Sequence, residues 1–411
     1  MSCVAREEGG RLLALLTDRL GDLEIAHDSL QEAYAKGAVT WADAGVPDDA
    51  AAWIYVVARN AGVDRLRRNL AEGRRVATNA RVLETAVADA DAGAVEAAAS
   101  ESRIVELSEV SDEQLRLLLL CCHPALSQDT QVTLTLRLAG GLTTQEVAAA
   151  LLLPEATVQQ RVVRAKRKIR AANIPLVIPE DLHERAAVLT TVLGLIFNEG
   201  YLAHAADAET LTRADVADQA IRLTATAADA LPDEPELAGL LALQLFHRSR
   251  EAARTDRDGA LVRLADQDRE LWDRAMIGRG FRVLAEAMAQ RRLGPWQVQA
   301  LIAAEHTRTS TNWPRVVRYH DLLLTMNPGP VARLARAVAV AEVEGPEAAL
   351  VEVDQIEGLE SYHLAHAARA DLWERVGDHA EALRAWDRAA ALATNPAEIH
   401  YVERRISALQ R

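Results

Sequence analysis

The chain has 411 residues, half of them hydrophobic, and is therefore long enough for two to four domains with packed cores. Only 4% are aromatic, while alanine and leucine dominate, so we expect an almost wholly α-helical protein. The net charge of −14 argues against nucleic-acid binding over the whole surface. Most of the excess acid lies beyond residue 172, where 26 Lys and Arg stand against 36 Asp and Glu, compared with 20 and 24 before it. Any DNA binding is therefore expected to be local and to depend on a larger partner.

Several classes of protein do not fit this sequence. Cys3, Cys121 and Cys122 form neither a CxxC pattern nor a disulfide framework, which fits a reducing cytoplasm. Two adjacent cysteines cannot both bind one metal ion easily, so we expect no metal ion and no cofactor. No apolar stretch reaches the ~18 residues of a membrane span, and the N-terminus does not resemble a signal peptide. No P-loop or nucleophile–base pattern is present, so we expect a cytoplasmic protein that is not an enzyme.

The first helical segment is expected over residues 11–36, with a break allowed at Gly21-Asp22. Polar residues at positions i, i+4, i+7 and i+8 lie on one face of this segment and offer a surface to another protein. They are Glu24, Asp28, Gln31 and Glu32. A loop is expected over 37–50, because this stretch contains Gly45, Pro47 and three aspartates.

The next helix is expected from its cap at Asp49 to about Leu70, with Trp53 on its apolar face. This position favours a core residue over a platform on which bases stack. Residues 77–110 follow as an Ala-rich acidic linker, with nine acids against two arginines in 81–113. Before the linker lies a basic cluster made of Arg65, Arg67, Arg68, Arg74 and Arg75.

Residues 143–170 have the pattern of a helix-turn-helix, within a module at 111–174. Thr143 and Glu146 can form a capping box that starts the first short helix, and Pro154 can open the second. The second helix has one apolar stripe at i, i+4, i+7 and i+11. The stripe consists of Val158, Val162, Ala165 and Ile169.

This second helix carries six cationic residues between Arg161 and Arg170 and no acid. Structural surface helices usually mix both signs, so the pattern favours a recognition helix. Its N-terminal half can reach base edges, while its C-terminal half holds phosphates. A plain basic surface helix is the alternative.

A long run of helices is expected beyond Pro175 and Pro179. Residues 372–386, LWERVGDHAEALRAW, resemble a tetratricopeptide repeat (TPR), and a related unit lies near 345–350. We expect one or two helical hairpins of this kind.

Two segments resemble region 2 of bacterial extracytoplasmic-function (ECF) sigma factors of the sigma-70 family: DLEIAHDSLQEAY at 22–34 and WIYVVARNAGVDRLRR at 53–68. The helix-turn-helix is similar to their region 4, and the order of region 2, acidic linker and region 4 is the same. LIFNEGY at 195–201 and LPDEPE at 231–236 resemble the subgroup with a long TPR-like C-terminal extension. The resemblance implies an all-α protein with region 2 at 1–76, a linker at 77–110, region 4 at 111–174 and the extension at 175–411.

The resemblance also implies a transcription initiation factor that binds core RNA polymerase, recognises −35 and −10 promoter elements and promotes DNA melting. The implied partners are promoter DNA and the β′ clamp helices and β flap of the polymerase, with the acidic face around Asp28 on the clamp helices. His27 stands where the family usually has an acid, which would weaken this contact or make it respond to pH. The residues implied for the −10 element are Pro47, Asp48, Arg59, Asn60, Asp64, Arg67 and Arg68.

For the −35 element, arginine suits guanine and glutamine suits adenine. Lysines and arginines nearer the end of the recognition helix are expected on phosphates, among them Arg167 and Arg170. The set implied for the −35 element is Thr157, Gln159, Gln160, Arg161, Arg164, Lys166 and Lys168.

Two other functions remain open at the level of sequence. A stand-alone helix-turn-helix regulator with a TPR-like sensor would bind an operator by itself, but it would not need the acidic and basic helices of 22–68. A TPR scaffold with a degenerate helix-turn-helix would not contact DNA. The C-terminal extension is expected to regulate or stabilise the protein and to bind an unidentified protein partner.

Overall fold

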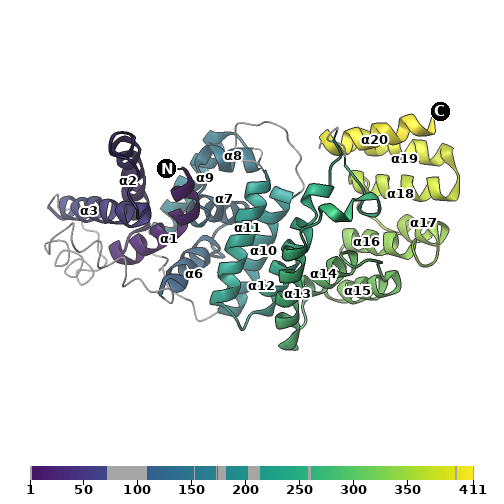
Figure 1. Cartoon of the computed structure of the whole chain (residues 1–411), viewed down its shortest axis with the longest axis horizontal. Helices are drawn as coiled ribbons and strands as arrows, with labels where there is room; N and C mark the ends of the chain where they lie inside the picture. Colours follow the sequence, from purple (N-terminus) through teal and green to yellow (C-terminus); the bar gives the residue numbers. More distant parts are fainter. Residues whose placement is uncertain are drawn as a thin grey trace. The chain divides into compact units, whose positions relative to one another are not determined.

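The computed structural model describes most of the chain as helices (Figure 1). In the described residues the only pairing of extended backbone is an isolated bridge between Thr255 and Leu261, so the all-α prediction is confirmed. Contacts divide the chain into two units, Met1–Glu199 with Asp218–Leu231, and Gly200–Ala217 with Pro232–Arg411. The described residues are 2–71, 109–151, 153–172, 174, 182–201, 213–257, 261–393 and 396–410.

The first unit begins with three mutually packed helices, α1 (Ser2–Leu20), α2 (Leu23–Ala44) and α3 (Ala50–Ala71). Of the two alternatives that the sequence left open for 11–36, the structure shows two helices with a break at Gly21-Asp22. Gly21 has φ of 67°, which glycine adopts without strain, and the Asp22 side chain accepts hydrogen bonds from the backbone N–H groups of the next helix.

The predicted loop over 37–50 is too long, because α2 continues to Ala44 and only 45–49 are non-helical. Trp41 explains the extra turns, since its side chain is only 8% exposed and packs edge-on against Trp53 at 5.4 Å. The contact between the two tryptophans outweighs the weak helix propensity of Gly37, which lies inside α2. The predicted cap of α3 is confirmed by a 2.8 Å hydrogen bond from the Ala52 N–H to Asp49.

The helix-turn-helix module consists of α6 (Glu109–Cys121), α7 (Gln128–Leu134), the π-helical turn η1 (Thr135–Ala139), α8 (Thr144–Leu151) and α9 (Glu155–Ala171). The predicted capping box is confirmed. The Thr143 N–H donates to the Glu146 carboxylate at 2.7 Å, and the Glu146 N–H donates to the Thr143 hydroxyl at 3.1 Å. Pro154 is the N-cap of α9, so this helix begins where the sequence predicts.

Some predictions fall outside the described residues. They concern the acidic linker at 77–110 except for its last two residues, Arg74 and Arg75 of the basic cluster, and the prolines at 175 and 179. Two later helices, α10 (Leu182–Tyr201) and α11 (Arg213–Ala230), belong largely to the first unit. The predicted domain boundary at 175 stays a prediction, while the contacts divide the chain at Glu199 and within α11.

The second unit is organised around α12 (Pro235–Arg248), which is largely buried and packs against both α13 (Arg274–Ala289) and α14 (Pro295–His306). Three short 3-10 turns, η2 (Glu251–Ala253), η3 (Leu264–Asp266) and η4 (Arg269–Leu271), lie between α12 and α13. Each remaining helix packs against the next one along the chain. These helices are α15 (Trp313–Met326), α16 (Pro330–Val340), α17 (Pro346–Asp354), α18 (His363–Val376), α19 (His379–Leu392) and α20 (Pro396–Leu409).

The hairpin of α18 and α19 contains the segment that resembles a TPR. Its turn places Gly377 in the left-handed region at φ of 91°, and Asp378 caps α19. Trp386 is buried between the helices of this hairpin and α20. The hairpin is thus present, and its identity as a TPR remains a prediction.

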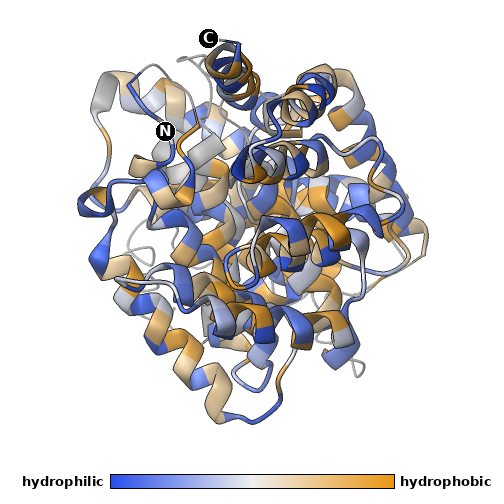
Figure 2. Ribbon diagram, turned by 90° about the vertical axis from the view of Figure 1, so that its right-hand side faces the viewer, coloured by the Kyte–Doolittle hydropathy of each residue, from blue (hydrophilic) through white to orange (hydrophobic). Residues whose placement is uncertain are grey.

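Most helices carry both hydrophobic and hydrophilic residues, as expected for helices that bury one side (Figure 2). Among the described helices, none combines the length and the apolar character that a membrane crossing requires.

Candidate functional site

The recognition helix α9 has two distinct sides. Its predicted apolar stripe is confirmed, since Val158, Val162, Ala165 and Ile169 are all buried. Gln159, Gln160 and Arg164 are exposed on the N-terminal and middle turns, and Thr157 is half-buried. These polar side chains are therefore accessible to a partner that approaches α9 from outside the module.

Several contacts fix the approach of the chain to α9. The capping box holds the start of α8, and the Arg137 side chain donates to the Leu142 carbonyl at 3.1 Å. Arg137 lies in the π-helical turn η1, half-buried, and it was not singled out from the sequence. Arg137, which is not one of the predicted DNA-binding residues, thus helps to fix the geometry of the helix-turn-helix.

Three further cations of α9 are engaged within the chain, while Arg167 is exposed. The Arg161 guanidinium lies 3.3 Å from the Asp129 carboxylate, and the Lys168 ammonium donates to the Ala125 carbonyl. The Arg170 guanidinium lies 3.2 Å from the Asp22 carboxylate. Only part of the predicted DNA-binding set therefore stands free on the surface.

Lys166 is half-buried at the end of α9 that is nearest to α2. Burial lowers the pKa of Lys166 to about 8. The carboxylate of Asp28 opposes this shift, which places the two charges close together. A residue expected on DNA phosphates thus faces the acidic surface of α2.

The acidic face predicted on α2 exists, and three of its four residues take part in ion pairs. The Arg65 guanidinium of α3 lies 3.0 Å from the Asp28 carboxylate and 3.8 Å from that of Glu32. Glu24 pairs with Arg170, and Gln31 is exposed. The structure brings the four residues together, and it adds two arginines that the sequence pattern did not connect with them.

His27 is buried in the first unit, at the edge of the acidic face and next to Asp28. Its Nδ1 atom lies 3.7 Å from the nearer Asp28 oxygen, too far for a hydrogen bond. Burial lowers the pKa of His27 to about 4. The ring is therefore neutral near pH 7, and any response of this position to pH is confined to the acidic range.

The residues predicted for the −10 element are distributed unevenly. Pro47 and Asp48 lie in the loop before α3, and Asp64, Arg67 and Arg68 are exposed near its end. Asn60 is half-buried. Arg59 is only 9% exposed, so it is part of the packed side of α3 and does not join the exposed cations.

Comparison with known proteins accounts for this arrangement of a helical bundle followed by a helix-turn-helix. Residues 4–71 match the family described as Sigma-70 region 2, and residues 116–169 match Sigma-70, region 4. The chain belongs to the sigma-70 family. Residues 185–288 of this sigma factor match a family of unknown function (DUF6596).

An uncharacterized protein of Rhizobium meliloti is similar to the sigma factor over nearly its whole length. The two are 40% identical over 395 residues, which cover 94% of this chain and 90% of the relative. No solved structure matches the chain.

The two sigma regions and the long segment after them make this an ECF-type sigma factor with a C-terminal extension. It acts in transcription initiation, and its sigma regions bind the RNA polymerase core and promoter DNA. Regions 2 and 4 work by binding and not by catalysis. The prediction of a sigma factor is confirmed, while the role of the extension remains to be assigned.

Proposed function

We propose that the sigma factor docks on core RNA polymerase through the acidic face of α2, with the β′ clamp helices as the contact of region 2 and the β flap as that of region 4. Glu24, Asp28, Gln31 and Glu32 supply carboxylates and an amide on one helical face. Charge-assisted hydrogen bonds to basic residues of the polymerase are stronger than neutral ones. The observation that carries the proposal is this exposed acidic face on a region 2 bundle that precedes a region 4 recognition helix.

The −35 element is read by the exposed side of α9. Gln159, Gln160 and Arg164 have the donor and acceptor patterns that suit adenine and guanine in the major groove. Thr157 and Arg161 flank them, and Lys166 and Lys168 reach phosphates once their contacts inside the chain are exchanged for DNA.

The −10 element is melted and held by the loop before α3 and by the exposed end of that helix. Pro47 and Asp48 border the position of an unstacked base. Arg67 and Arg68 attract the phosphates of the separated strand, with Asn60 and Asp64 beside them. Arg59 supports this helix from its packed side.

The C-terminal extension acts as a fused regulatory domain that resembles a TPR stack and binds a protein partner. Support comes from the consecutive helical hairpins of the second unit, which offer the kind of extended surface that repeat proteins use. A chain that ends after Leu231 retains the whole first unit, and we expect it to transcribe more weakly than the full chain. Equal transcription by both chains would remove the extension from the mechanism.

The decisive experiment is reconstitution of the full chain with core polymerase and a library of promoters. We expect the holoenzyme to initiate from a subset that shares −35 and −10 sequences, and the free chain to select none of them tightly. Tight, sequence-specific binding by the free chain without polymerase would instead identify a stand-alone regulator.

A further inference from the structure

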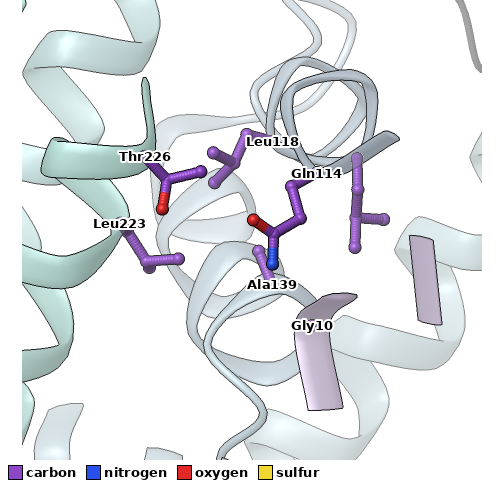
Figure 3. A pocket seen from close by; sticks show the side chains of 7 residues that line it. Gly10, Gln114, Leu118, Ala139, Leu223 and Thr226 are labelled. Atoms are coloured by element: carbon purple, nitrogen blue, oxygen red, sulfur yellow. The ribbon is translucent and has the colours of Figure 1, made fainter. Parts of the chain in front are cut away.

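A gap inside the first unit is too small to be a ligand site. Leu223 and Thr226 of α11 line it together with Gly10 and Ala139, and its volume is about 10 Å³ (Figure 3). This volume has room for one water molecule at most. The chemistry of a further binding site lies instead on an exposed surface of the second unit, along α13.

The helix α13 packs against the rest of the unit through one side. Its buried residues are Ile277, Gly280, Leu284 and Ala287, and the helix contacts α12 and α14. Gly280 allows a close approach, because a Cβ atom there would lie 2.8 Å from a ring carbon of Phe246 on α12. One such buried side is what an amphipathic helix at the surface of a domain requires.

A second row of apolar residues lies on the exposed part of α13. Phe281, Ala285 and Met288 are at positions i, i+4 and i+7, so they are neighbours along one side of the helix. All three are exposed, Phe281 and Met288 at 36% each. The Phe281 ring contacts Phe246 edge-on, with the ring centroids 5.1 Å apart. A single exposed apolar residue is ordinary, but a contiguous row of them marks an interaction surface.

Arginines accompany this row. Residues 274–292 contain five arginines and one acid, Glu286, although acids outnumber bases by 36 to 26 beyond residue 172. Among the described residues, no carboxylate forms an ion pair with any of these arginines, and two of them donate hydrogen bonds to neutral oxygens nearby. All five are exposed, and they are Arg274, Arg279, Arg282, Arg291 and Arg292.

Other arginines of the second unit have a different role. Arg336 on α16 pairs with Asp321 and Glu352, and Arg375 on α18 pairs with Glu342. These pairs connect one helix of the unit with another. The arginines of α13 have no such counter-charge among the described residues, so their charges are available to a partner.

We propose that α13 binds an acidic amphipathic helix of a partner protein, with Phe281, Ala285 and Met288 against its apolar side and Arg279 and Arg282 on its carboxylates. The inference rests on the proposed role of the C-terminal extension in binding a protein partner, and it names the surface and the chemistry of that partner. Phenylalanine, methionine and arginine are enriched in protein interfaces. The phosphate backbone of DNA has no apolar surface that this row could cover, so the row favours a protein over a nucleic acid.

A designed peptide tests the chemistry of this surface. The fluorescently labelled probe has 16 residues, the length of α13, with leucines at positions i, i+4 and i+7 and glutamates on either side of them. A matched peptide has glutamine in place of every glutamate. We expect the full chain to bind the glutamate peptide at least tenfold more tightly, and added salt to reduce this difference. Fluorescence anisotropy measures both affinities.

Variants of the full chain locate the binding. Arg279→Glu with Arg282→Glu should weaken binding of the glutamate peptide at least tenfold. Arg333→Glu with Arg388→Glu makes the same change in net charge at exposed positions of α16 and α19, and should leave the affinity unchanged.

A second pair of variants tests the apolar row. Met288→Gln should weaken binding at least threefold, whereas Met326→Gln, at a similarly exposed methionine of α15, should not. Circular dichroism verifies that each variant is folded.

The outcomes separate the inference from the proposed function. Equal binding of the two peptides, or equal effects of the two pairs of arginine substitutions, overturns the α13 surface. A short DNA duplex that binds more tightly than the peptide, and depends on Arg279 and Arg282 but not on Met288, overturns the protein partner. Equal transcription by the full chain and by the chain that ends after Leu231 overturns the proposed role of the extension itself, and the inference that rests on it as well.

Discussion

The helices α2 and α9 carry opposite charges, and they differ in how much of that charge is already used inside the chain. On α2, Asp28 and Glu32 share Arg65, and Glu24 pairs with Arg170. On α9, the side chains proposed to read bases, such as Arg164, are exposed. The base-reading side chains of α9 are thus exposed, while the carboxylates of the polymerase-binding face are also exposed but are already paired with arginines of the same chain.

This difference bears on the free-energy cost of holoenzyme assembly. Exposed ion pairs contribute little to stability, because water and salt screen them. Exchange of Arg65 and Arg170 for basic residues of the polymerase therefore costs little at α2.

The largest effect is expected at the acidic face. Asp28→Arg with Glu32→Arg should weaken holoenzyme assembly by about 2–5 kcal/mol, because cations of the partner would then meet cations on α2. Competition with the unmodified chain for core polymerase measures the change. Arg65→Met removes the internal pairs but leaves both acids, so it should assemble normally. Undiminished co-purification of the double variant would locate the polymerase contact elsewhere.

The inner side of α2 should respond to acid, in contrast to its outer face. Because burial lowers the pKa of His27 to about 4, the unfolded state binds more protons than the folded state below the ordinary value of 6.5. The free energy of unfolding should therefore decrease as pH falls from about 6.5 to 4, by on the order of 3 kcal/mol in total. Urea denaturation at several pH values measures this slope.

Matched variants isolate the contribution of this ring. His27→Leu should flatten the slope, whereas His183→Leu, at an exposed position of the same unit, should leave it unchanged. Equal slopes in the wild type and His27→Leu would show that other groups cause the acid sensitivity.

On α9 the comparison is between a residue proposed to contact a base and a residue proposed to contact a phosphate. Arg164→Ala should cost about 1–3 kcal/mol and relax the preference at one −35 position. Lys168→Ala should weaken binding to all sequences and lower the salt slope by about one. The loss of affinity is reduced because the wild-type lysine must give up its internal bond to the Ala125 carbonyl when it contacts a phosphate. Both are measured in the holoenzyme against a promoter library at several salt concentrations. Identical sequence profiles for the two variants would contradict the division of roles.

The smallest effect is expected at the capping box that starts α8. Thr143→Ala removes the hydroxyl that accepts from the Glu146 N–H and should lower the stability of the first unit by about 1 kcal/mol. Thermal unfolding measures the loss, with Thr144→Ala as the neighbouring control. An equal loss in both variants would mean that the box contributes nothing specific.

Local signals predicted much of the fold. The capping pairs of α3 and α8, the glycine break after α1 and the stripe of α9 each depend on residues within a few positions of one another. The loop predicted over 37–50 was too long, and no local signal could have shortened it. Trp41 is helical because it contacts Trp53 on another helix. Arg59 matched a DNA-binding pattern, yet packing of α3 turns it inward.

The sequence by itself determined the helical class and the charge of the two functional faces, since these follow from composition and periodicity. The order of the sigma regions followed from the resemblance of residues 22–68 and 143–170 to the ECF sigma factors. Only the tertiary structure decided which charges remain free. The pairs Arg170 with Asp22 and Arg116 with Asp18 join residues that are 148 and 98 positions apart. No periodicity relates such residues, because their distance is set by how the apolar faces of α1, α6 and η1 pack together.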